Sequence, residues 1–126
     1  MTALRDLDAQ FVGHVVSDLQ LRSYRRQGNQ VEGAQGVLFQ CPVCSVGLEE
    51  GTEDGRHFYR GAHYVLVWFR NPRNAPNVPA EVWPKPRWTF TGDTLDTLTL
   101  TPSINLIDDK GNTTCWHGHV TNGQTT

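Results

Sequence analysis

The sequence has no apolar run of the roughly 18 residues that a transmembrane helix needs, so it predicts no membrane span. Its first residues also lack the charged-then-apolar pattern of a secretory signal peptide. The sequence also lacks a large excess of either positive or negative charge. The 11 basic and 13 acidic residues give a net charge of −2, which disfavours a nucleic-acid-binding protein. Together these absences predict a cytoplasmic protein.

Cysteine is scarce too, and its placement is informative. Three cysteines cannot form a fully paired set of disulfides within one chain. All three fall in two short clusters, a Cys-x-x-Cys at 41–44 and a Cys-x-His-x-His at 115–119. A Cys-x-x-Cys turn can present two thiolates to one tetrahedral ion, and a distant Cys/His pair can complete the shell. The pattern therefore predicts a Zn²⁺ site in a reducing compartment.

Three ligands of this predicted site are Cys41, Cys44 and Cys115. The fourth is open among His117, His119 and His63, and we favour His117 because one residue separates it from Cys115. His63 has two other interpretations, a hydrogen-bonding cap of the strand that follows it or an acid/base group near the metal. If one zinc position stayed open, the metal could activate water, with His63 or His119 moving protons.

Twelve Gly, seven Pro and 37% hydrophobic residues favour a fold rich in strands and loops. We predict a mainly β fold, a small zinc-stabilised antiparallel β domain with one or two short helices. Residues 1–30 are expected to form a polar, partly helical extension, with Leu4, Leu7 and Phe11 at helical spacing. Residues 31–126 are expected to form the zinc-binding β domain, so that the chain is one globular unit.

Local patterns predict several elements of that domain. Short strands are expected at 37–40, 88–92 and 97–101, and Pro102 is expected to end the last of them. The continuously apolar stretch 63–69 predicts a central strand that is covered on both faces. Residues 46–60 are expected to form a surface loop, residues 71–86 a proline-rich connector, and Asn122-Gly123 a type I′ turn.

These motifs resemble an uncharacterised zinc-binding family associated with phages, whose members are often automatically labelled as ammonia monooxygenases. The resemblance covers most of residues 31–123. The matching stretches are Ala34–Phe39, Cys41–Cys44, Gly61–His63, Trp68–Phe69, Pro86–Trp88, Gly92, Leu98–Ile104 and Cys115–Gly123. The resemblance implies Cys41, Cys44, Cys115 and His117 as metal ligands and His63 as a further family position. It implies no established activity.

A closed Cys₃His set without a recognisable catalytic carboxylate favours a protein that is not an enzyme. The leading hypothesis is a zinc-binding phage accessory protein that binds a host or phage macromolecule, most simply a protein. The alternative is a zinc-dependent hydrolase of nucleic acid or nucleotides, with His63 and His119 near the metal. Nucleic acid binding without catalysis is a less favoured hypothesis, which would use the basic residues Arg22, Arg25, Arg26, Lys85 and Arg87. The sequence leaves the oligomeric state open.

Overall fold

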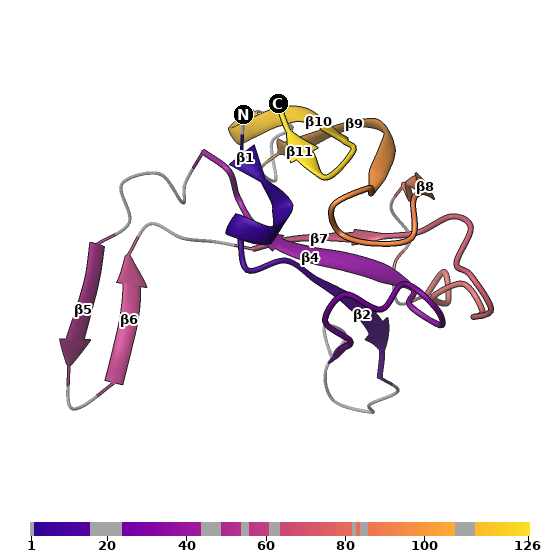
Figure 1. Ribbon diagram of the computed structural model, residues 1–126, viewed down its shortest axis with the longest axis horizontal. Helices are drawn as coiled ribbons and strands as arrows, with labels where there is room; N and C mark the ends of the chain where they lie inside the picture. The colour runs from indigo at the N-terminus through magenta and orange to yellow at the C-terminus, as the bar shows by residue number, and fades with distance from the viewer. Residues whose placement is uncertain are drawn as a thin grey trace.

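The computed structural model of the protein describes residues 2–15, 24–43, 49–53, 56–60, 64–81, 83, 86–107 and 113–126. Antiparallel sheets dominate it (Figure 1). The first sheet has the order β1 (Thr2–Ala3), β11 (Gln124–Thr125), β10 (Thr113–Thr121), β9 (Thr99–Ile107), β8 (Thr89–Thr91). The second has the order β3 (Tyr24–Arg26), β2 (Gln10–His14), β4 (Gly36–Gln40), β7 (Tyr64–Trp68). A separate hairpin consists of β5 (Glu49–Glu53) and β6 (Arg56–Arg60).

The first two sheets pack face to face around one core, to which both contribute aromatic rings. Phe69, just beyond β7, stacks on Phe90 of β8 with ring centroids 4.2 Å apart. Phe39 of β4 meets Trp116 of β10 edge to face, with centroids 5.9 Å apart. Such pairs add about 0.5–1.5 kcal/mol beyond the burial of their surface. These contacts hold the β9–β10 ladder in a fixed place over the second sheet.

The mainly β fold predicted from the sequence is confirmed, but the helical start is wrong. Leu4–Asp6 is a single turn of 3₁₀ helix, and the chain then enters β2. Leu4, Leu7 and Phe11 are nonetheless buried in the core. Phe11 pairs with Val37 of β4, so strand pairing overrides a spacing that also fits a helix. Strands from the two sides of residue 30 therefore share one sheet.

Two further expectations of local structure are wrong. The stretch 46–60 contains the β5–β6 hairpin in place of a surface loop. The apolar strand β7 is buried on both faces, as predicted, but it is the last strand of its sheet and not a central one. The second face of that strand is covered by Val78 and Trp83 of the proline-rich connector. The connector thus supplies the layer that a further strand or helix would otherwise provide.

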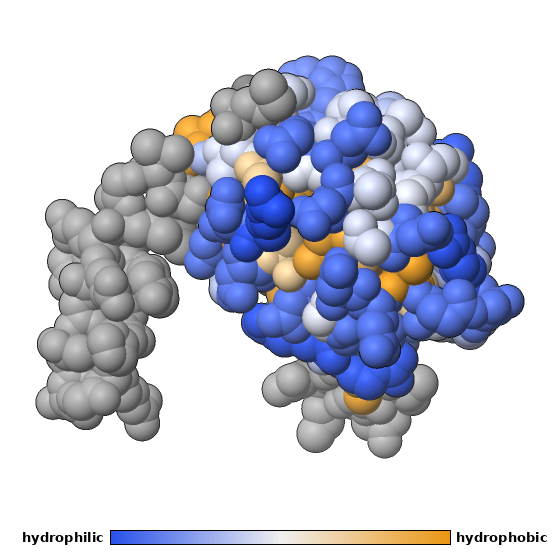
Figure 2. Space-filling view, in the orientation of Figure 1, coloured by the Kyte–Doolittle hydropathy of each residue, from blue (hydrophilic) through white to orange (hydrophobic). Residues whose placement is uncertain are grey.

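The Asn122-Gly123 turn is confirmed, since both residues have positive φ angles, +48° and +73°. It joins β10 to β11 and fixes their register. Among the described residues, no helix is long and apolar enough to cross a membrane. On the face shown in Figure 2, hydrophilic residues cover most of the described surface.

The phenol of Tyr64 predicts an alkaline limit to the stability of the second sheet. Its hydroxyl donates a 2.6 Å hydrogen bond to Asp8, and this bond is the main cause of a pKa raised above 10. The folded state therefore favours the protonated phenol. This contribution is complete below pH of about 10, the unfolded pKa of tyrosine, and is lost as pH rises through the folded pKa.

We expect urea unfolding between pH 7 and 11 to show this loss in the wild type and not in Tyr64→Phe. Asp8→Asn should weaken the same pH dependence, because the amide carries no negative charge and accepts the phenol hydrogen bond less strongly than the carboxylate does. An equal alkaline decline in wild type and Tyr64→Phe would show that another group causes it.

Candidate active site

The β9–β10 ladder brings a serine and a histidine together on its exposed face. Buried Trp116, Gly118 and Val120 alternate along β10 with exposed His117 and His119. On β9, Ser103 is half-buried and its side chain reaches across to β10. Its Oγ lies 3.3 Å from His117 Nε2. A hydroxyl in hydrogen-bonding contact with an imidazole is the arrangement that activates a serine nucleophile.

A bulge in β9 gives Ser103 its position. Gly118 pairs with Ile104, and Val120 pairs with Leu100, so two steps along β10 correspond to four along β9. The additional residues of β9 lie around Pro102 and Ser103. Pro102 has no N–H to donate to a ladder, and a bulge is one of the few places in a sheet that accept it. Bulges redirect side chains and often lie beside active sites.

The expectation that Pro102 ends its strand is therefore wrong, because β9 continues through it to Ile107. The bulge provides the local irregularity that lets the strand do so. Because of this bulge, Ser103 lies where β9 departs from regular pairing with β10.

In the part of the chain that the structure describes, Ser103 is the side chain that hydrogen-bonds the His117 ring. Asn105 lies directly opposite His117 in the β9–β10 register. His119 faces the same side as His117 but has no described contact with Ser103. The two histidines of the Cys-x-His-x-His cluster are thus distinguished by their neighbours.

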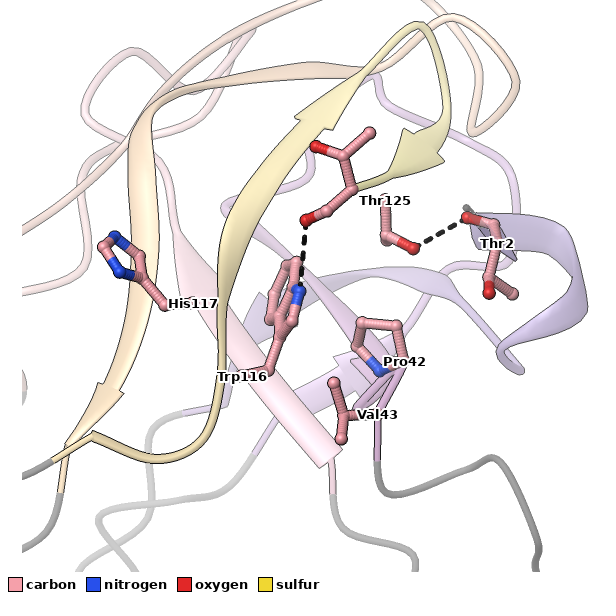
Figure 3. A pocket seen from close by; sticks show the side chains of 7 residues that line it. Thr2, Pro42, Val43, Trp116, His117 and Thr125 are labelled. Carbon is pink, nitrogen blue, oxygen red and sulfur yellow. Dashed lines mark hydrogen bonds between the residues drawn. The ribbon is translucent and has the colours of Figure 1, made fainter.

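A cavity of about 480 Å³ adjoins β10 at Trp116 and His117. Figure 3 shows the Trp116 side chain on the cavity side of the strand and the His117 ring pointing away from Pro42 and Val43. Val43 is 51% exposed, more than any other aliphatic side chain among the large hydrophobic residues that the structure describes. The lining is mostly apolar and consists of Thr2, Pro42, Val43, Trp116, His117, Thr125 and Thr126.

The structure places only some of the predicted metal ligands. Cys41 is buried directly after β4, and His117 lies on the exposed face of β10. Cys44 and His63 lie outside the described residues, as does the side chain of Cys115. Among the side chains that are described, no three His, Cys, Asp or Glu groups lie together as a metal site would require. The ligand set Cys41, Cys44, Cys115 and His117, with its Zn²⁺, stays an untested prediction.

The family comparison bears directly on this geometry. A model of BubE, described as the bacterial ubiquitination-like system serine protease, matches residues 50–126, more than half of the chain. The chain belongs to the BubE family. No curated protein and no solved structure matches it. The BubE segment contains both β9 and β10, and hence both members of the Ser103–His117 pair.

The BubE match corrects the function predicted from the sequence. The resemblance to a zinc-binding phage family is wrong, because the matching family is one of serine proteases. For the same reason, the hypothesis of a zinc-binding accessory protein without enzymatic activity is wrong, and so is the alternative of a zinc-dependent nucleic acid or nucleotide hydrolase. Both hypotheses gave the histidines a role at a metal, and neither considered a serine.

Sequence reasoning missed Ser103 for a physical reason. Ser103 and His117 are 14 residues apart on two strands, and only the register of the β9–β10 ladder brings them together. One signal was nevertheless present. Of the four serines in the chain, Ser103 alone falls within residues 50–126. Within the BubE segment, therefore, a serine nucleophile has one possible position.

Proposed function

We propose that the protein is a serine peptidase that acts on a protein of a bacterial ubiquitination-like system. Ser103 is its nucleophile and His117 its general base. The observation that carries the proposal is the 3.3 Å contact between Ser103 Oγ and His117 Nε2. It involves the one serine of the segment that matches a serine protease family. The protein partner predicted from the sequence is then the substrate.

The pair can perform both halves of peptide hydrolysis. His117 Nε2 takes the Ser103 hydroxyl proton as Oγ bonds to the carbonyl carbon of the scissile peptide. The tetrahedral intermediate collapses when the C–N bond breaks, and His117 gives that proton to the leaving amine. A water molecule then loses a proton to His117 and attacks the acyl-enzyme ester. Ser103 leaves with that proton, and the carboxylic acid product is released.

The geometry of the unliganded pair fits this role. A separation of 3.3 Å is slightly longer than the 2.6–3.2 Å of a tight catalytic hydrogen bond, and such contacts are often loose before substrate binds. His117 is exposed, so its ring can exchange protons with solvent and reach a leaving group. The apolar cavity beside β10 offers a place for an apolar side chain of the substrate.

Covalent labelling tests the proposal without knowledge of the natural substrate. We expect a biotinylated fluorophosphonate to react with the folded protein, with Ser103 Oγ displacing fluoride at phosphorus. Tryptic mapping by mass spectrometry should place the adduct on Ser103. Ser17, Ser23 and Ser45 serve as internal controls in the same digest. Absence of an adduct on Ser103, or equal labelling of all four serines, would contradict the proposal.

A further inference from the structure

We propose that Trp88 is a positioning residue that holds the peptide backbone of the nucleophile in its reactive place. The inference rests on the proposed function, since it assigns Ser103 as that nucleophile. The contact that carries it joins Trp88 Nε1 to the Ser103 carbonyl oxygen at 3.3 Å. Trp88 does not touch the reacting atoms in this interpretation and acts through Ser103.

The backbone of Trp88 is fixed to the second sheet. Its N–H donates to the Trp68 carbonyl at 3.1 Å, and its carbonyl accepts from the Arg70 N–H at 2.7 Å. These bonds form a parallel bridge between Trp88 and Phe69, just beyond the end of β7. The next residue begins β8, a strand of the first sheet. Trp88 therefore lies where the chain crosses from one sheet to the other.

The indole of Trp88 supplies a hydrogen bond that the regular ladder does not. The β8–β9 pairing ends at Thr89 and Thr101, two residues before Ser103. Beyond that point β9 bulges, and bulges leave backbone groups without ladder partners. A half-buried carbonyl without a partner is costly. The half-buried indole, packed against the main core, donates its N–H to this carbonyl.

The indole bond also restricts the orientation of the nucleophile. The Ser103 carbonyl and the Ile104 N–H belong to one planar, trans peptide unit and point in opposite directions. Ile104 pairs with Gly118 of β10 on one side, and the Ser103 carbonyl meets Trp88 on the other. Holding the unit at both ends limits its rotation. Since Oγ projects from the same residue, its distance to His117 is limited as well.

Loss of the indole N–H should therefore slow chemistry more than binding. A misplacement of about 1 Å in a catalytic group can lower the rate about 100-fold. We expect Trp88→Phe to lower the rate constant of fluorophosphonate labelling at Ser103 by about 10- to 100-fold. With a peptide substrate, kcat should fall by a similar factor while KM changes less than about 3-fold, because Trp88 does not contact the substrate.

Trp83→Phe is the matched control. Trp83 is also half-buried, and its Nε1 also donates to a backbone carbonyl, that of Pro86 at 3.2 Å, but not to Ser103. We expect this variant to be labelled at the wild-type rate. A second variant removes the N–H of Trp88 alone, by incorporation of 3-benzothienylalanine, whose sulfur replaces the indole nitrogen. It should show the same slow labelling as Trp88→Phe, with the Tm close to that of the wild type.

The outcomes separate the two proposals. If the wild type is not labelled at Ser103, the proposed function fails and the role of Trp88 fails with it. If the wild type is labelled and the benzothienyl variant reacts equally fast, only the role of Trp88 is overturned. Equal slowing in Trp83→Phe would also overturn it, because the effect would then follow from loss of any buried indole. Slow labelling confined to position 88 supports the inference.

Discussion

Alanine at position 103 is expected to lower kcat/KM for peptide hydrolysis by about 10⁴-fold or more. The variant removes the oxygen that forms the acyl-enzyme in the proposed mechanism, and no other described hydroxyl lies within hydrogen-bonding distance of His117. The activity should be measured with a quenched-fluorescent peptide library that the wild type hydrolyses. Folding should be unaffected, since Ser103 is only half-buried and its side chain makes one described hydrogen bond.

Thr101→Ala is the matched control for Ser103→Ala. Thr101 lies on the same strand, two residues earlier, and it too carries a hydroxyl, but its side chain is exposed and not in contact with His117. We expect it to retain activity within about 3-fold and to be labelled at Ser103. Circular dichroism and thermal unfolding should show both variants folded. Full activity in Ser103→Ala would rule out Ser103 as the nucleophile.

The sequence predicted correctly those strands and turns whose own residue types favour the observed backbone conformation. Residues 37–39 and 64–68 are apolar and mostly β-branched or aromatic, and they lie in β4 and β7, in which most side chains are buried or half-buried. The Asn122-Gly123 turn needs two positive φ angles, which these residue types tolerate. The prediction of an N-terminal helix was wrong because the spacing of Leu4, Leu7 and Phe11 fits an amphipathic helix as well as the core contacts that these residues make. Only pairing with β4 selects between them.

The Ser103–His117 contact could not be predicted from the sequence for a related reason. Ser103 and His117 belong to no short motif, and their contact depends on the two extra residues of the β9 bulge. A regular ladder would shift the Ser103 side chain along or across the sheet. The cysteines drew attention because Cys-x-x-Cys is a local pattern that can be recognised without a fold. That pattern led to the interpretation of His117 as a metal ligand, whereas the described hydrogen-bonding contact of its ring is with Ser103.

His117→Ala is expected to lower kcat/KM by about 10⁴-fold, because Ser103 then has no base to accept its proton. Fluorophosphonate labelling of Ser103 should slow by a comparable factor, since that reaction also begins with proton removal. His119→Ala is the matched control. His119 lies two residues further along β10, is exposed on the same face and makes no described contact with Ser103. We expect it to keep activity within about 3-fold.

The same variants distinguish a base from a metal ligand. A base on the exposed face can be removed with little loss of stability, so His117→Ala should unfold within about 1 kcal/mol of the wild type. A ligand of structural zinc cannot, because metal binding of that kind contributes directly to the free energy of folding, by about 10 kcal/mol or more. Metal content measured by mass spectrometry on wild type and His117→Ala completes the comparison. Loss of both zinc and stability in His117→Ala would support the predicted ligand set, and it would contradict the assignment of His117 Nε2 as the base that activates Ser103.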